Sequence, residues 1–135
     1  MKRNSRLFLA LHALMHMAGD PNGVRTSAAI AEHAGTNPVV VRRVLGRLRR
    51  AGLLYSEKGH AGGWRLAKSP QHITFADVYL ALDERLIAPD TGTEEPQCSV
   101  EHSLHRTVTG VLDEVERSLI HRLAQTSIAG VSVTT

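Results

Sequence analysis

Five arginines lie within the nine positions from Arg42 to Arg50, and this density is the first chemical signal in the sequence. Guanidinium groups bind phosphate oxygens, and with two parallel hydrogen bonds they also grip the edge of guanine. Val39 and Val40 come just before the arginines and can contact thymine methyl groups. The alternative is a solvated arginine face on an ordinary helix. Two exposed apolar residues beside the arginines favour contact with nucleic acid.

Charge is divided unevenly along the chain, although the formal net charge is only +3. Residues 1–68 hold twelve lysines and arginines against three acids, and residues 69–135 hold four against ten. The first part therefore carries +9 and the second −6, which together give the net charge of +3. A basic half that meets a polyanion explains this division, and chance segregation of solvated charges is the alternative.

Length and composition limit the class of protein. The chain has 135 residues, of which 42% are hydrophobic and 21% charged, as expected of one globular, water-soluble domain with a short appendage. The apolar stretch from Leu7 to Ala18 is too short to cross a bilayer and is interrupted by His12 and His16, so no membrane contact is expected. The N-terminus lacks the pattern of an export signal. We therefore expect a cytoplasmic protein.

The arginines fall on the third of three predicted helices. The spacing of apolar residues, and the glycine, proline and capping residues at the ends of each segment, place these helices at about 5–17, 27–34 and 38–51. Thr26 or Ser27 can cap the second helix, and Asn37 followed by Pro38 is typical of a helix start. Between the second and third helices, the small Ala31, then Gly35, then the branched Val41 suit a tight helix crossing. This pattern predicts a helix-turn-helix whose second helix enters the DNA major groove.

A hairpin is predicted directly after the third helix, as in the wing of a winged helix. The segments 53–57 and 64–67 are strand-like and flank the glycine-rich loop 59–63. Lys58, His60 and Arg65 surround this tip, which can approach the DNA backbone closely. Trp64 is expected to anchor the wing to the core rather than to stack on a base.

The second half is predicted to hold a short helix, a loop and one long amphipathic helix. Thr74 can cap the short helix, which runs to about Leu82, and proline, glycine and acidic residues over 88–97 favour a loop. Apolar residues repeat at intervals of three and four from Val100 to Leu123, a helix of some 40 Å. Such a helix overhangs the core that the first half offers, which favours a twofold dimer over packing on its own domain.

These elements predict a mainly α fold with a small β-hairpin wing. We expect a winged helix-turn-helix DNA-binding domain over 1–82, a sensor-type loop over 83–99, and a dimerisation helix and tail over 100–135. The residues predicted to contact DNA are Ser27, Asn37, Val39, Val40, Arg42, Arg43, Arg47, Arg50, Lys58, His60 and Arg65.

The ordered motifs resemble the Rrf-two (Rrf2) family of bacterial winged-helix regulators, which includes IscR- and NsrR-type repressors. The resemblance covers nearly the whole chain and rests on the segments 27–31, 37–38, 45–48, 51–53, 62–66, 73–74 and 77–78. It implies a homodimeric transcription regulator, usually a repressor, that binds a palindromic operator in double-stranded DNA. Members often carry a serine and an aromatic residue where Val39 and Val40 stand, and an acid where Arg42 stands. The family's base preference therefore does not carry over.

The signal that such a regulator would sense is left open by the sequence. Cluster-binding members carry three cysteines before the long helix, whereas this chain has only Cys98, so an iron–sulfur cluster is not expected. Cys98 precedes a helix N-terminus, which suits a reactive thiol, and an inert packed cysteine is the alternative. Cys98, His102 and His105 can also share one helix face and bind a metal, with Glu94 or Glu95 as a fourth ligand. A small effector is a further possibility.

The sequence thus predicts a sequence-specific DNA-binding regulator, in our interpretation a homodimeric repressor that responds to a redox, metal or small-molecule signal. The alternative is a winged-helix module that binds proteins, or nucleic acid without sequence preference. An enzyme is not expected, because the sequence has no phosphate-binding loop, nucleophile elbow or complete metalloprotease motif.

Overall fold

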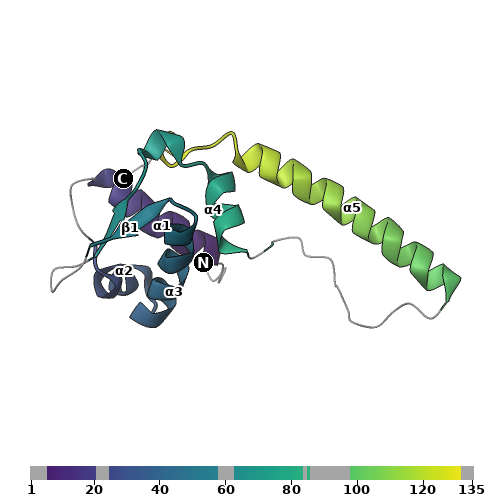
Figure 1. The fold of residues 1–135 in the computed structure, drawn as a ribbon, viewed down its shortest axis with the longest axis horizontal. Helices are drawn as coiled ribbons and strands as arrows, with labels where there is room; N and C mark the ends of the chain where they lie inside the picture. The colour runs from purple at the N-terminus through teal and green to yellow at the C-terminus, as the bar shows by residue number, and fades with distance from the viewer. Residues whose placement is uncertain (1–5, 21–24, 58–62, 84, 86–97, 132–135) are drawn as a thin grey trace.

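Seven helices and strands make up most of the described structure. The computed structural model describes residues 6–20, 25–57, 63–83, 85 and 98–131. In chain order the elements are α1 (Arg6–Gly19), α2 (Ser27–Ala34), α3 (Pro38–Arg50), β1 (Leu54–Ser56), β2 (Trp64–Leu66), α4 (Phe75–Leu82) and α5 (Ser99–Leu123). Two short 3-10 helices, η1 (Pro70–His72) and η2 (Ile128–Gly130), complete the fold. Figure 1 shows α1 to α4 gathered together while α5 extends away from them, and the mainly helical class is confirmed.

The helix-turn-helix begins and ends at the residues that the sequence indicated. The Thr26 hydroxyl accepts a hydrogen bond from the Ala29 amide (3.1 Å), and the Asn37 carboxamide oxygen accepts one from the Val40 amide (3.0 Å). Each bond satisfies an amide that the first turn of a helix leaves without a partner. Gly35 ends α2 with a φ of 71°, a left-handed conformation that glycine adopts without strain.

One hydrophobic core holds α3 in place. The inner stripe of α3 is fully buried, and it contacts α1, α2 and α4. The stripe consists of the four residues that the apolar spacing indicated: Val41, Val44, Leu45 and Leu48. Ala31, on α2, is 2% exposed, and α2 contacts α3. Its small side chain allows the close crossing that the sequence predicted.

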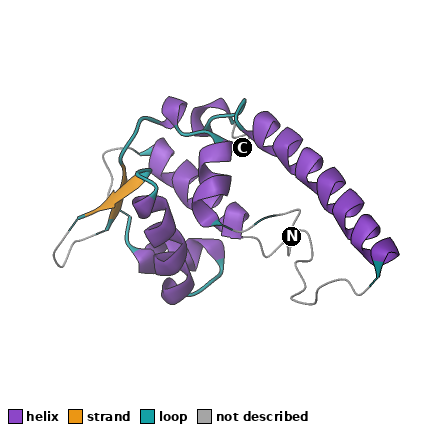
Figure 2. Cartoon of the chain, turned by 45° about the vertical axis from the view of Figure 1, so that its right-hand side comes forward, coloured by secondary structure: helices purple, strands orange, loops and turns teal. Residues whose placement is uncertain are grey.

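The hairpin has a third, very short partner. Strands β1 and β2 are antiparallel, with Leu54 opposite Leu66 and Ser56 opposite Trp64 (Figure 2). Arg25, just before α2, forms a bridge to the other edge of β2, and the Trp64 amide donates to the Arg25 carbonyl (2.8 Å). The sequence did not indicate this bridge, because a single paired residue carries no alternating pattern. The hairpin tip, residues 58–62, lies outside the described residues.

Helix α5 has two different apolar surfaces. Its last turns pack on the core through Leu119, Ile120 and Leu123, and the helix contacts α4. Along its earlier turns an apolar stripe is exposed, from 66% at Val100 to 44% at Val115, with Leu104, Val108 and Val111 between them. The predicted long helix is confirmed, and its N-terminal turns project beyond the other elements in Figure 1. No helix in the described part of the chain is long and apolar enough to span a membrane.

The segment after α5, which was predicted to be a tail, returns to the core. The Phe75 amide donates to the Thr126 carbonyl (2.8 Å), and the Ile128 amide donates to the Ile73 carbonyl (2.9 Å). The Ile128 side chain is 1% exposed within the core, and η2 contacts α1. The segment after α5 therefore completes the core of the N-terminal domain. The sequence did not indicate this packing, because a short segment with one buried apolar residue has no periodic pattern.

Truncating Ile128 should destabilise the whole domain. Ile128→Ala leaves a cavity in the core, and we expect the free energy of unfolding to fall by about 2–5 kcal/mol in a urea titration. Val131→Ala is the matched control, because Val131 is 36% exposed and its truncation should change stability by less than about 0.5 kcal/mol. Equal effects of the two variants would contradict a core role for the C-terminal segment.

Candidate nucleic-acid interface

The outer face of α3 carries a set of exposed guanidinium groups. Four of them are exposed, namely those of Arg42, Arg43, Arg49 and Arg50. Within the described residues, no carboxylate forms an ion pair with any of these four. They lie opposite the buried stripe, so the packing of α3 on the core turns their positive charge outward.

The two valines that precede these arginines differ in exposure. Val39 is 56% exposed, as predicted for a residue that contacts a base. Val40 is partly buried and packs against the core, so the prediction that it is exposed is wrong. The reason is helical geometry, since Val40 lies one position before the buried Val41 and four before the buried Val44. Only Val39 is a free apolar contact at the start of α3.

A shallow hollow runs beside these arginines. Its volume is about 500 Å³, and it is lined by Arg42, Arg43, Gly46, Arg47, Arg49, Arg50 and Trp64. Five cationic side chains around one concave surface create a strong positive potential. The wing residue Trp64 borders this surface, so β2 reaches the edge of the cationic face of α3.

Arg47 has an internal partner. Its Nη1 donates to the Leu82 carbonyl (2.8 Å), and the side chain is half-buried. The bond satisfies a carbonyl at the C-terminal end of α4, which ends in the left-handed residue Asp83 with a φ of 52°. Arg47 therefore links α3 to α4, and a phosphate contact would have to share or replace this bond.

Ser27 and Asn37 also have structural partners. The indole Nε1 of Trp64 donates to the Ser27 hydroxyl (2.9 Å), which fixes the wing to the start of α2. The predicted anchoring role of Trp64 is thus confirmed. The Asn37 carboxamide oxygen caps α3, as described above. The side chains of both predicted DNA contacts stabilise the elements that carry the arginines.

The remaining wing residues are only partly described. Arg65 Nε lies 2.8 Å from Glu57 Oε1, and both side chains are about one third exposed, at 27% and 39%. Arg65 Nε has no hydrogen-bond partner among the described residues, so the contact is an ion pair across the hairpin. It partly neutralises the charge of Arg65 in the free protein. Lys58 and His60 lie outside the described residues.

Helix α5 is fixed to α4 through a buried carboxylate. Glu116 is 7% exposed, and it accepts hydrogen bonds from the Tyr79 hydroxyl (3.3 Å) and from Arg85 Nη1 (3.0 Å). A buried carboxylate is stable only with such partners. Arg85 stands at the start of the predicted loop over 83–99, most of which lies outside the described residues, so this contact ties the beginning of the loop to α5.

The predicted metal ligands near α5 do not converge. Cys98 is exposed and caps α5, where its Sγ accepts a hydrogen bond from the Glu101 amide (3.4 Å). His102 and His105 are exposed on the same helix, yet the three side chains form no ligand cluster in the described structure. With Cys98 at the cap position, its side chain is turned back onto the first turn. Glu94 and Glu95 lie outside the described residues.

The structure contains a different histidine cluster, which the sequence did not indicate. His12, His16 and His33 come together between α1 and α2, with their potential ligand nitrogens all within 4.8 Å of one another. The spacing of four between His12 and His16 was the available signal, because it places both rings on one helix face. His33 comes from another helix, and only the fold shows that it joins them.

The whole arrangement matches one known family. The family model Rrf2, described as an iron-dependent transcriptional regulator, matches residues 3–133. The chain belongs to the Rrf2 family. The HTH-type regulator YwnA of Bacillus subtilis (strain 168), named on a provisional basis, is 34% identical over 130 residues, which cover 95% of each chain. YffB of Lactococcus lactis subsp. lactis (strain IL1403), also provisionally named as an HTH-type transcriptional regulator, is 29% identical over 98% of this chain and 87% of its own.

Solved structures of similar fold agree with this assignment. A crystal structure described provisionally as a DNA-binding protein is 30% identical, with a TM-score of 0.75 over 93% of this chain and 97% of the other. IscR of T. potens, at 24% identity, shares the fold with a TM-score of 0.66 over 96% of this chain and 85% of its own. As an Rrf2 protein the chain is a DNA-binding transcription regulator with a winged helix rather than an enzyme, as the sequence predicted.

The family description names iron, but this chain lacks the set of cysteine ligands that an iron–sulfur cluster needs. Iron–sulfur clusters are held mainly by several cysteine thiolates. This chain has a single cysteine, and Cys98 uses its sulfur to cap α5. The donor set therefore does not fit an iron–sulfur cluster of the three-cysteine type.

Removing the Ser27 hydroxyl should loosen the wing. Ser27→Ala leaves the half-buried Trp64 indole without its acceptor, and we expect a loss of about 1 kcal/mol in the free energy of unfolding. Trp64 is the only tryptophan in the chain, so its fluorescence in a urea titration reports both stability and the exposure of the wing. Ser99→Ala, at an exposed position of α5, is the control. A Trp64 emission and stability unchanged by Ser27→Ala would contradict the anchoring role.

Proposed function

We propose that this Rrf2 protein acts as a homodimeric repressor that binds a palindromic operator in double-stranded DNA. The observation that carries the proposal is the outer face of α3, where exposed arginines follow the exposed Val39. No carboxylate among the described residues pairs with these arginines. In a helix-turn-helix this is the surface that enters the major groove.

The positions along α3 suggest different roles for its arginines. Arg42 and Arg43 lie in the N-terminal half of the helix, which reaches base edges in this motif. Arg49 and Arg50 lie in the last turn, where the helix leaves the groove and phosphate contacts are expected. Arg47 and Arg65 already have internal partners, so they contribute to DNA binding chiefly by holding α3 and the wing in position.

A second copy of the chain is the partner we propose for the exposed stripe of α5. The stripe extends over about four turns, from Val100 to Val115, and none of the described elements covers it. Two such helices packed around a twofold axis would remove both stripes from water. The same axis would present two α3 helices to the two halves of a palindrome.

The proposed signal input is the segment between α4 and α5. Its first end is held by the Arg85 contact to Glu116, and its second end leads into the Cys98 cap of α5. A thiol reaction at Cys98 or a small effector bound at this segment stays a prediction. Either event would change the contacts of Arg85 or Cys98 with α5, and with them the position of that helix.

Salt dependence should separate the two classes of arginine. We expect Arg50→Ala to reduce the slope of log K against log salt by about 0.9, equally on operator and scrambled DNA, because one phosphate contact is lost. Arg43→Ala should instead reduce the preference for the operator, by about 1–3 kcal/mol. Fluorescence anisotropy with DNA from upstream of the protein's own gene measures both quantities.

The matched control for these variants is Arg106→Ala, which removes an exposed arginine on α5 and should leave both quantities unchanged. A loss of sequence preference in Arg50→Ala without a change in slope would show that the roles are assigned wrongly. Equal binding of operator and scrambled DNA by the wild type would favour the alternative, a module without sequence preference.

The dimer is tested by placing a charge in the α5 stripe. Val108→Asp should convert the dimer into a monomer, because an unpaired carboxylate cannot be buried in an apolar interface. Light scattering coupled to size-exclusion chromatography measures the mass. His102→Asp, at an exposed position outside the stripe, should remain dimeric. A wild-type monomer, or a dimer that survives Val108→Asp, would contradict the α5 interface.

A further inference from the structure

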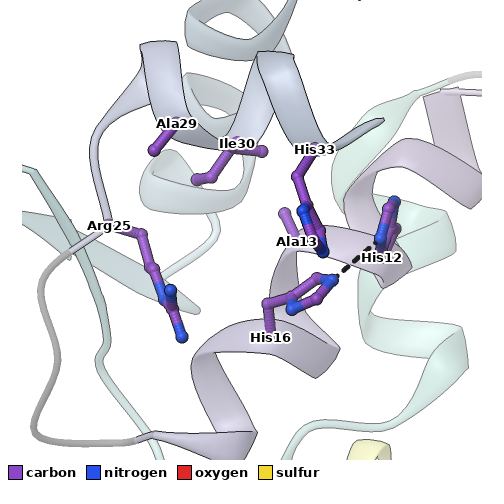
Figure 3. Close-up of a pocket in the computed structure, with 7 residues that line it drawn as sticks. All are labelled: His12, Ala13, His16, Arg25, Ala29, Ile30 and His33. Atoms are coloured by element: carbon purple, nitrogen blue, oxygen red, sulfur yellow. Dashed lines mark hydrogen bonds between the residues drawn. The ribbon is translucent and has the colours of Figure 1, made fainter. Parts of the chain in front are cut away.

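Three imidazole rings from α1 and α2 face one another at the edge of a pocket (Figure 3). His12 Nε2 and His16 Nε2 are 2.9 Å apart. The ring centre of His33 lies 4.3 Å from that of His16 and 5.7 Å from that of His12. In the described part of the chain, this is the one place where three potential metal ligands of the histidine, cysteine or carboxylate type meet.

The fold itself brings the rings together. His12 and His16 are four residues apart, so both project from the same face of α1. The packing of α2 on α1 brings His33 to that face. Ala13 and Ala29 also line the pocket, and their small side chains leave a volume of about 290 Å³ beside the rings. The cluster therefore has room for an ion and for a further ligand.

Burial lowers the pKa of His16, and the nearby charges of His12, His33 and Arg25 lower it further. A metal ion would bind the rings in their neutral form, through the lone pair of a ring nitrogen.

Arg25 gives the pocket a second property. It lines the same pocket, and its buried Nε has no hydrogen-bond partner within the described residues. Its positive charge opposes a bare cation. The same charge favours an anion next to the metal, such as hydroxide or a carboxylate.

We propose that His12, His16 and His33 bind one divalent first-row transition-metal ion of the zinc type, with a fourth position open to water or an anion. Three protein ligands with one open position are typical of zinc sites that are not purely structural. In a tetrahedral site with Zn–N distances near 2.0–2.1 Å, the ligand nitrogens stand about 3.4 Å apart. The potential ligand nitrogens now lie within 4.8 Å of one another, so the rings would have to turn to bind the ion. The proposal does not depend on the proposed repressor function.

Zinc itself is the probe. Untagged protein, freed of metal with a chelator, is titrated with ZnCl₂ against a chromophoric competitor. We expect one saturable site per chain in the wild type. His33→Ala should weaken it by more than about 100-fold, because loss of a residue that merely supports a ligand already costs 10–100-fold. His33 is exposed, so this variant should keep its fold, which circular dichroism verifies.

His102→Ala is the matched control, since it removes an exposed histidine from the other set of predicted ligands near α5. We expect it to bind zinc as the wild type does. Retained binding in His33→Ala together with lost binding in His102→Ala would overturn the proposal and place the metal near Cys98. A wild type without a one-to-one site would overturn it as well.

A second readout tests whether the metal joins the two helices. Zinc should raise the melting temperature of the wild type and of His102→Ala, because a ligand that binds only the folded state stabilises it. The melting temperature of His33→Ala should not respond. Co²⁺ in place of zinc should give the visible absorption of a tetrahedral site in the wild type and in His102→Ala, but not in His33→Ala. A wild type without this absorption would contradict the three-histidine geometry.

Discussion

The burial of the inner stripe of α3 is the constraint on which the rest of the structure depends. The stripe packs against three other helices, so the rotation of α3 about its own axis is fixed by the core. Fixing that rotation fixes the direction of every other side chain on the helix. The cationic face is thus positioned without a bond from any described residue to the side chains of the exposed arginines.

Trp64 connects most of the elements around α3. Its backbone joins β2 to Arg25, its indole is bound by Ser27 at the start of α2, and its ring borders the arginine hollow. The wing, the first helix of the helix-turn-helix and the recognition helix therefore share one contact point. In this arrangement a displacement of the wing is coupled to the entry of α2 and to the surface beside α3.

Local patterns in the sequence predicted the helices well. They did not predict the contacts between segments that are far apart in the chain. The caps Thr26 and Asn37 and the apolar stripe of α3 are encoded within a few residues, so the boundaries were visible in the sequence. The bond from Arg47 to Leu82 spans 35 positions and has no local pattern. The same applies to the return of Ile128 to the core and to the meeting of His33 with His12 and His16. The exposure of Val40 was predicted wrongly because neighbouring positions on a helix differ in direction by 100°.

Helix α5 has 25 residues, held at its C-terminal end by the core and by the Glu116 contacts. From Glu116 to its N-terminal end at Ser99 the helix runs about 26 Å at 1.5 Å per residue, so it forms a lever arm with its pivot at α4. A rotation of about 10° at the pivot would move the far end by about 4–5 Å, more than the rise of one base pair in B-DNA. A small rotation around Glu116 would thus become a displacement of several ångströms at the far end of the helix.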